Sequence, residues 1–229
     1  MNLLVTTRAD AVCANWVELT HPIIRRYAER IGADFIVLDE AVGGIGNGVY
    51  QYRIMKHYDL HEEYDRILHL DTDMLLTPNC PNLFEEVPYD HIASIYEDIG
   101  SRQPQRVQCM LNAQQQFGDI GWREKYINTG VFVTSEVHRD IYPKIDGKYF
   151  VDWGTDDIHI GYLINKYGYK VKELSYHYNH MTMFSEEWNN SPCRFDSHII
   201  HYAGRGVFDP LEATDKLHQA KLDYQRLYK

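Results

Sequence analysis

The chain has 229 residues, of which 44% are hydrophobic and 24% charged, and this composition argues against disordered and fibrous proteins. A formal net charge of −10 at pH 7 argues against a nucleic-acid-binding protein, which needs clustered lysine and arginine. No stretch approaches the roughly 18 consecutive apolar residues of a membrane span. The opening residues do not resemble a signal peptide. The four cysteines are scattered and form no C-x-x-C pair, which indicates reduced thiols. We therefore expect a single cytoplasmic domain over residues 1–229, with no membrane span and no nucleic-acid partner.

The first forty residues predict a strand, a helix and a second strand. Apolar residues 3–5 form the first strand, which runs into two threonines and an arginine at 6–8, a reasonable place for a ligand. Thr20 can cap a helix that Gly32 ends, and residues 34–38 form the second strand. This order is typical of a parallel sheet with a right-handed crossover, so the expected fold class is α/β.

The next stretch predicts a loop and a helix. The glycine-rich segment 43–48 fits neither the dinucleotide-binding nor the P-loop pattern, and we interpret it as a flexible loop. A helix is expected from about 50 to 61, with Arg53 and Lys56 on one face. For Arg53 two interpretations stay open, a solvated surface cation and a contact to a ligand.

The stretch 66–76 places two carboxylates at the end of a buried strand. The apolar run around 67–70 predicts a strand covered on both faces, and Asp71 and Asp73 follow it. Sites in parallel sheets open at the carboxyl ends of strands, and residues i and i+2 of an extended chain point the same way. The two carboxylates can therefore converge on one hard cation. A solvated turn is an equally open interpretation, because D-x-D alone is a weak motif.

A polar segment follows a predicted strand at 91–95. Segment 97–125 has no strand pattern, although apolar residues between 107 and 117 can form one face of a short helix. We interpret this segment as an insertion over the site, either an acceptor-side element or a lid.

Two later stretches combine polar residues with regular structure. Residues 128–130 (Asn-Thr-Gly) predict a small polar turn before a strand at 131–133. Thr155, Asp156 and Asp157 precede a helical pattern. Carboxylates at a helix start often do no more than complement the helix dipole, and for Asp157 that interpretation is strong.

The remainder predicts two strands and a terminal helix. The strands are expected at 170–178 and 197–202, and segment 209–229 is expected to be an amphipathic helix. Such a helix docks either on the sheet or on a partner, so a homodimer is left open.

Four sequence blocks resemble the GT-A glycosyltransferases, most closely the family 8 group of glycogenin-like and galactosyltransferase-like enzymes. The blocks are LHLDTD, INTGVFV, TDDIHI and HIIHYAG, which occur in the order of that family, and the resemblance covers roughly residues 2–206. It implies a single GT-A domain, a Rossmann-like nucleotide-diphospho-sugar transferase fold with a mostly parallel central sheet flanked by helices.

The resemblance also implies roles for individual residues. Asp71, Asp73 and His201 would bind the metal, Mn²⁺ or as an alternative Mg²⁺. Asp156 would lie near the anomeric carbon of the donor sugar, with Asp157 beside it as the second catalytic carboxylate. The residues expected to contact the UDP-sugar donor are Thr6, Thr7, Arg8, Arg53, Thr72, Asn128, Thr129, Gly130, Gly204 and Arg205.

The activity implied by the resemblance is transfer of a hexose from a UDP-sugar to a glycan, glycolipid or protein acceptor, with retention of configuration. The chain departs from the family where Asp156 occupies a position that is commonly an amide, and where Arg205 replaces the lysine of a Lys-Pro-Trp segment. Two alternatives stay open: a haloacid-dehalogenase-like phosphatase that uses the D-x-D, and a non-catalytic nucleotide-sugar or glycan-binding domain.

Overall fold

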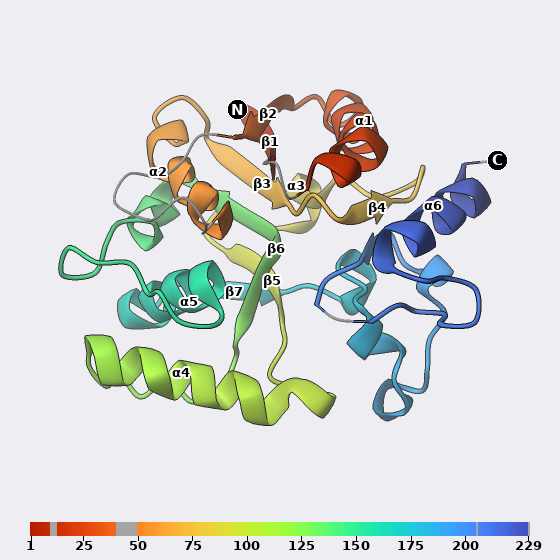
Figure 1. Ribbon diagram of the computed structural model, residues 1–229. Coiled ribbons are helices and arrows are strands. Elements are labelled where there is room, and N and C mark those ends of the chain that lie inside the picture. The colour runs from red at the N-terminus through yellow and green to blue at the C-terminus, as the bar shows by residue number, and fades with distance from the viewer. Residues whose placement is uncertain (10–12, 40–49, 205, 229) are drawn as a thin grey trace.

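The protein is described by a computed structural model over residues 1–9, 13–39, 50–204 and 206–228. Within these residues a central six-stranded sheet has, in spatial order, β2 (Asp34–Leu38), β1 (Leu3–Arg8), β3 (Arg66–Leu70), β6 (Ile127–Ser135), β5 (Ile92–Tyr96) and β7 (Val171–Glu173) (Figure 1). β6 is antiparallel to both of its neighbours, whereas the β1/β2, β1/β3 and β5/β7 pairs are parallel. The expected α/β fold with a mostly parallel sheet is therefore confirmed.

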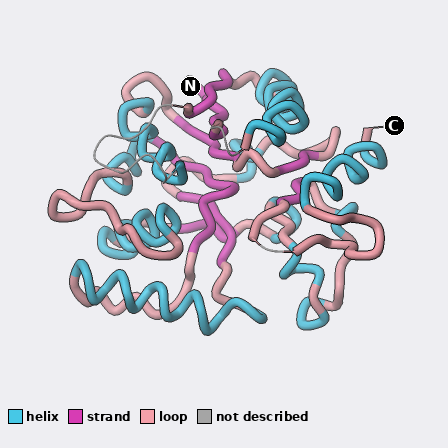
Figure 2. Tube along the Cα trace, in the orientation of Figure 1, coloured by secondary structure: helices cyan, strands magenta, loops and turns pink. Residues whose placement is uncertain are grey.

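Two apolar cores lie against the two faces of this sheet, with helices outside them (Figure 2). The first core joins the sheet to α1 (Ala14–Arg30), to α6 (Lys216–Leu227), and to a small antiparallel sheet of β4 (Met74–Leu76) and β8 (Ile199–His201). The second core joins it to α4 (Gln103–Phe117) and α5 (Thr155–Tyr167). Shorter helical pieces are α2 (His57–Leu60), α3 (Leu83–Glu86) and several 3₁₀ turns.

The predicted start of the first helix is wrong. α1 begins at Ala14 after Cys13, whose side chain makes no capping bond, so the sequence carries no cap signal at the true start. Thr20 lies inside the helix, and its hydroxyl donates to the carbonyls of Trp16 (2.9 Å) and Thr72 (2.6 Å). The second of these bonds joins α1 to the segment after β3.

Three further predictions differ from the structure in extent or type. The helix expected at 50–61 is a 3₁₀ helix, Tyr50–Lys56, followed by the single α-helical turn α2. The strand expected at 170–178 ends at Glu173 and is followed by a 3₁₀ turn, Tyr176–Tyr178. Residues 128–130 are not a turn, because β6 already begins at Ile127.

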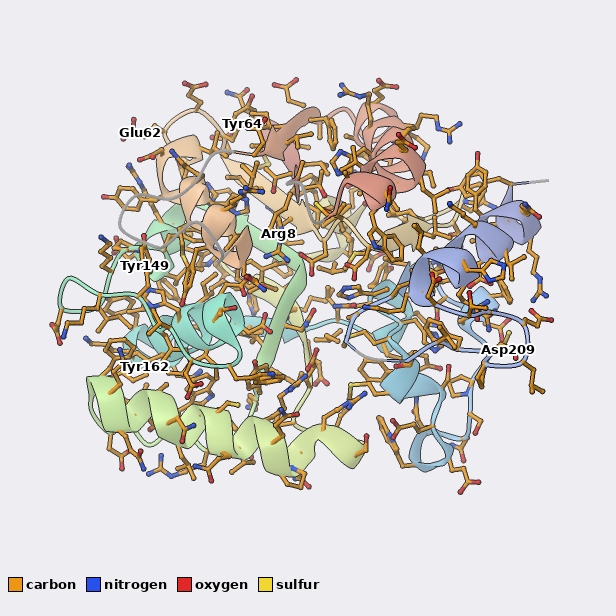
Figure 3. All side chains as sticks on the ribbon, in the orientation of Figure 1. Arg8, Glu62, Tyr64, Tyr149, Tyr162 and Asp209 are labelled. Carbon is orange, nitrogen blue, oxygen red and sulfur yellow. The ribbon has the colours of Figure 1, made fainter. Side chains whose placement is uncertain are left out.

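The remaining expectations concern the inserted segment, the tail and the membrane. Segment 97–125 contains α4. The hydroxyl of Tyr162 on α5 donates to the carbonyl of Phe117, the last residue of α4 (2.8 Å). Figure 3 labels Tyr162 beside α4. The helix expected over 209–229 is shorter in the structure, where α6 spans Lys216–Leu227 and residues 209–215 form turns and bends. The glycine-rich segment 43–48 lies outside the described residues. None of the described helices has the length and apolar character needed to cross a bilayer.

Candidate functional site

The polar residues predicted from the sequence gather at one edge of the sheet. β1 and β3 end there, and because β6 runs the other way, its first residues lie at the same edge. The backbone N–H of Asp71, just past β3, donates to the carbonyl of Gly130 (2.9 Å). A cleft of about 620 Å³ opens at this edge, a volume typical of small-molecule sites. Figure 3 labels Arg8, one of its lining residues, near the middle of the molecule.

Three predicted metal ligands meet in this cleft. One ligand atom from each of Asp71, Asp73 and His201 can be chosen so that all three lie within 4.8 Å of one another. His201 Nε2 is 3.2 Å from Asp73 Oδ1 and 3.6 Å from Asp71 Oδ2. Asp71 and Asp73 flank the turn between β3 and β4, and His201 ends β8, which pairs with β4.

The hydrogen bonds of His201 identify which ring nitrogen faces the carboxylates as an acceptor. Its Nδ1 lies 2.7 Å from Asn179 Oδ1, and an amide oxygen only accepts, so Nδ1 carries the proton. In the neutral ring Nε2 is then a bare lone pair. This atom is buried and has no hydrogen-bond partner among the described residues. The Nε2 lone pair faces the carboxylates of Asp71 and Asp73, and such a mixed nitrogen and oxygen set suits a divalent cation.

Gly130 leaves room for this group. A Cβ built on Gly130 would lie 2.7 Å from His201 Cε1, 2.8 Å from Asn128 Oδ1 and 3.1 Å from Asp71 Oδ2. Such distances are too short for any side chain. The glycine is therefore required by the close packing of β6 against two of the candidate ligands, Asp71 and His201, and against Asn128.

Arg8 makes the charge of Asp71 stable in a buried position. Its guanidinium pairs with the carboxylate of Asp71, and His69 Nε2 lies 3.4 Å from Asp71 Oδ1. Burial alone would raise the pKa of Asp71, but the positive charge of Arg8 holds that pKa well below its usual value. Asp71 is thus ionised and ready to bind a cation at neutral pH.

The same arginine reaches the predicted catalytic carboxylate. Arg8 Nη1 donates to Asp156 Oδ2 (3.1 Å), which also accepts from the Thr129 hydroxyl (3.0 Å). Asp156 stands in the first turn of α5, is 4% exposed and lines the cleft. The guanidinium of Arg8 therefore pairs with both carboxylates, Asp71 and Asp156.

Asp157 is held by the protein itself. Its Oδ1 accepts from the backbone N–H of Thr129 (2.8 Å) and lies 2.7 Å from the hydroxyl of that residue, and its Oδ2 faces the Tyr126 hydroxyl (3.4 Å). Burial, followed by the nearby charges of Asp156 and Glu97, raises the pKa of Asp157 well above its usual value. These contacts favour the interpretation of Asp157 as a structural carboxyl at the start of α5.

Asn128 is also engaged within the protein. Its Nδ2 donates to Glu97 Oε1 (2.7 Å), and its Oδ1 accepts from Asn179 Nδ2 (2.8 Å) and from the Gly130 N–H (3.0 Å). Both Asn128 and Thr129 nevertheless line the cleft.

The other predicted donor contacts fall into three groups. Thr72 and Gly204 line the cleft, and Gly204 has a positive φ of 68° that favours glycine. Thr6 points elsewhere, since its buried hydroxyl bonds to His57 Nε2 (2.8 Å) and His69 Nδ1 (3.0 Å). Thr7 is fully buried, and Arg53 donates to the carbonyl of Ala9; neither lines the cleft. Arg205 lies outside the described residues.

Several residues of the site were not found from the sequence. Glu97, which follows β5, lies at the carboxyl end of a strand just as Asp71 does, so the same signal applied to it. Arg106 of α4 pairs with Glu97 and lies 4.4 Å from the ring centroid of Trp153, a half-exposed side chain of the cleft. Asn179 gives the weakest signal, a polar residue among aromatic neighbours.

Comparison with solved structures supports the expected fold. A glycosyltransferase involved in glycosylation of the major capsid of PBCV-1 matches with a TM-score of 0.56 and 10% identity over 90% of this chain and 96% of that chain. The galactosyltransferase LgtC, solved with donor and acceptor sugar analogues, matches with a TM-score of 0.61 and 17% identity over 98% and 94%. Mouse xyloside xylosyltransferase 1 matches with a TM-score of 0.51 and 14% identity over 87% and 96%.

The chain has the GT-A glycosyltransferase fold. At these identities the likeness concerns the fold and not the substrates. No protein-family profile matches the sequence, and neither does any curated protein. The fold leaves the function open, so the evidence for a function is the cleft at the strand ends with its Asp-Asp-His group.

Proposed function

We propose that the protein is a Mn²⁺-dependent hexosyltransferase that uses a UDP-sugar donor and a glycan, glycolipid or protein acceptor, with retention of configuration. The observation that carries this proposal is the buried, unpaired Nε2 of His201, which faces the carboxylates of Asp71 and Asp73. The GT-A fold and the cleft of about 620 Å³ at the strand ends support it.

Asp71, Asp73 and His201 would hold the metal. A bound Mn²⁺ would supply Lewis acidity to the diphosphate leaving group when its bond to the sugar breaks. Mg²⁺ is the weaker candidate, because it prefers an all-oxygen ligand set. Gly130 contributes by keeping the space beside the three ligands free of side-chain atoms.

Asp156 would act on the donor sugar directly, and Arg8 would act by holding Asp156 and Asp71. The transfer breaks the bond between the anomeric carbon and the diphosphate oxygen and forms one to an acceptor hydroxyl, which loses its proton. Positive charge develops at the anomeric carbon, and the carboxylate of Asp156 can stabilise it. Arg8, between Asp71 and Asp156, pairs with both carboxylates and holds them in place. A carboxylate facing the sugar is consistent with retention.

A donor screen tests the proposal. Hydrolysis of UDP-, GDP- and dTDP-sugars is measured with and without Mn²⁺, for the wild type, for Asp156→Asn and for Asp157→Asn. We expect metal-dependent turnover of a UDP-sugar, a loss of about 10²-fold or more in kcat for Asp156→Asn, and a smaller loss for Asp157→Asn. Neither turnover nor metal-dependent binding with any donor would overturn the proposal.

The same preparation separates the alternatives. Turnover of p-nitrophenyl phosphate that depends on Asp71 would support a phosphatase. Metal-dependent donor binding without transfer or hydrolysis, across a panel of acceptors, would support a binding domain. The donor hexose and the acceptor would follow from the pair that gives the highest kcat/KM.

A further inference from the structure

A continuous chain of buried side chains leads from His201 to the helix α4. His201 Nδ1 bonds to Asn179 Oδ1 (2.7 Å), Asn179 Nδ2 to Asn128 Oδ1 (2.8 Å), and Asn128 Nδ2 to Glu97 Oε1 (2.7 Å). Glu97 Oε2 accepts from Arg106 Nε (2.6 Å) on α4. Asn179 is fully buried, and Glu97 is 2% exposed.

The Glu97–Arg106 pair at the far end of this chain determines which group donates and which accepts in every hydrogen bond of the chain. A carboxylate paired with arginine only accepts, so Asn128 must turn its N–H groups towards Glu97 and its oxygen towards Asn179. Asn179 must then present its nitrogen to Asn128 and its oxygen to His201. The Gly130 N–H, which donates to Asn128 Oδ1 (3.0 Å), requires the same orientation. His201 is thereby left with its proton on Nδ1 and its lone pair on Nε2.

We propose that Asn179 is a positioning residue that holds His201 in the tautomer and orientation required to bind the metal. This inference rests on the metal site of the proposed function. Partners of this kind fix the ring of a metal-binding histidine and raise its basicity, and their loss typically weakens metal affinity by about 10- to 100-fold.

The backbone around Asn179 is held independently of its side chain. The N–H of His201 donates to the carbonyl of His180 (3.0 Å), and the N–H of His180 donates to the carbonyl of Ile199 (2.9 Å). These bonds keep the segment beside β8 whatever residue occupies position 179. A substitution there is therefore expected to release the ring of His201 without displacing its strand.

The first experiment measures Mn²⁺ affinity without donor, from the free Mn²⁺ signal in electron paramagnetic resonance. Asn179→Ala is expected to bind about 10- to 100-fold more weakly than the wild type. Asn179→Asp, which keeps an acceptor for Nδ1–H, is expected to recover at least part of that loss. The matched control is Asn189→Ala, which removes a similar bond to the carbonyl of Phe184 (2.8 Å) and is expected to leave affinity unchanged.

The second experiment reads the tautomer directly by ¹⁵N NMR of histidine-labelled, metal-free protein, with His201→Ala identifying the signal. The wild type is expected to show Nδ1 protonated and Nε2 bare, and Asn179→Ala is expected to lose this preference. An unchanged tautomer together with wild-type affinity in Asn179→Ala would overturn the inference. If the wild type itself binds no Mn²⁺, the metal site of the proposed function fails, while the NMR result still decides the role of Asn179.

Discussion

At the scale of single residues, the candidate site depends on side chains that bind one another and on Gly130, which leaves space for them because it has no Cβ. Asp71 keeps its charge because Arg8 pairs with it, and His201 keeps a lone pair on Nε2 because its Nδ1–H donates to the side-chain oxygen of Asn179. Gly130 admits both groups by having no Cβ. Each of these side chains is fixed by a neighbour, so changes here should act on the metal site before they act on the fold.

Gly130→Ala should weaken Mn²⁺ binding by at least about 10-fold, because the new Cβ would force His201 or Asn128 out of place. We expect a cost of about 1–3 kcal/mol in the free energy of unfolding. Calorimetric titration with Mn²⁺ measures the first effect and urea unfolding the second. Gly168→Ala is the control: its φ of 71° makes an alanine strained there too, yet open space surrounds the site, so metal affinity should not change.

Asp157→Asn should become more stable relative to the wild type as the pH rises. The raised pKa of Asp157 means that the folded state keeps a proton which the unfolded chain releases above about pH 4. Wild-type stability from this group therefore falls as pH increases towards the folded-state pKa, by at most about 1.4 kcal/mol per pH unit. An asparagine has no such proton to release.

Urea unfolding of the metal-free protein at pH 5 and pH 8 checks this prediction. Asp119→Asn is the control: the hydrogen bond from Arg123 lowers the pKa of this surface carboxyl, so Asp119 is ionised in both the folded and the unfolded chain above about pH 5, and its replacement should not change the difference in stability between pH 5 and pH 8. Parallel stability curves for the wild type and Asp157→Asn would show that Asp157 is ionised in the folded protein.

At the scale of elements, the direction of β6 decides how the site is assembled. Because β6 is antiparallel to β3 and β5, its first residues lie beside the last residues of those strands. Asn128 and Gly130 remain in an extended strand because their polar groups are bonded to Glu97, Asn179 and each other. A polar run that looks like a turn in the sequence is here a strand whose polar atoms are satisfied by distant residues.

A buried carboxylate of α6 bonds to the residue that follows His201, one of the three candidate metal ligands. Asp223, fully buried, accepts from Arg194 Nε (2.7 Å) and Nη2 (2.8 Å), and from the hydroxyl of Tyr202 (2.8 Å), which follows His201. Asp223→Ala should cost about 3–5 kcal/mol in the free energy of unfolding, because it leaves Arg194 buried without its partner.

Urea unfolding of Asp223→Ala beside Arg226→Ala tests this claim. Arg226 pairs with Glu212 at the surface (2.6 Å), where an ion pair contributes about 0–1 kcal/mol. The two variants should therefore differ several-fold in their effect. Equal losses would mean that the Asp223 bridge stabilises the protein no more than a surface pair.

At the scale of the whole molecule, an ion held as proposed by Asp71, Asp73 and His201 should stabilise the fold, because Asp73 directly precedes β4 whereas His201 ends the neighbouring strand β8. Mn²⁺ at about 100 times its Kd adds about 2.7 kcal/mol, which for a chain of this length raises the Tm by about 5–10 °C. EDTA should reverse the rise. Differential scanning calorimetry measures it.

The variant Asp73→Asn provides the matched comparison. Asp73 is partly exposed and its carboxylate faces His201, so its replacement should leave the metal-free Tm nearly unchanged while abolishing the increase with Mn²⁺. The same increase in wild type and variant would show that the ion binds elsewhere.

Much of the architecture followed from local pattern. Apolar runs fix the strands β1, β2, β3 and β5, since alternation and burial are properties of neighbouring residues. The D-x-D after β3 indicated a cation site because strand ends share one edge of a sheet. The start of α1 could not be found in this way, because Cys13 provides no cap.

The sequence by itself determined the α/β class, the strand that carries Asp71 and Asp73, and through its resemblance the expectation that His201 joins them. Only the tertiary structure decided that Thr6 bonds to two histidines away from the cleft, and that the oxygen of Asn179 accepts a hydrogen bond from Nδ1–H of His201. The physical reason is that a hydrogen bond depends on how close two groups lie in space, whatever their separation along the chain. Residues far apart in the chain, brought together by the antiparallel β6 and the β4/β8 pair, leave no periodic signal in the sequence.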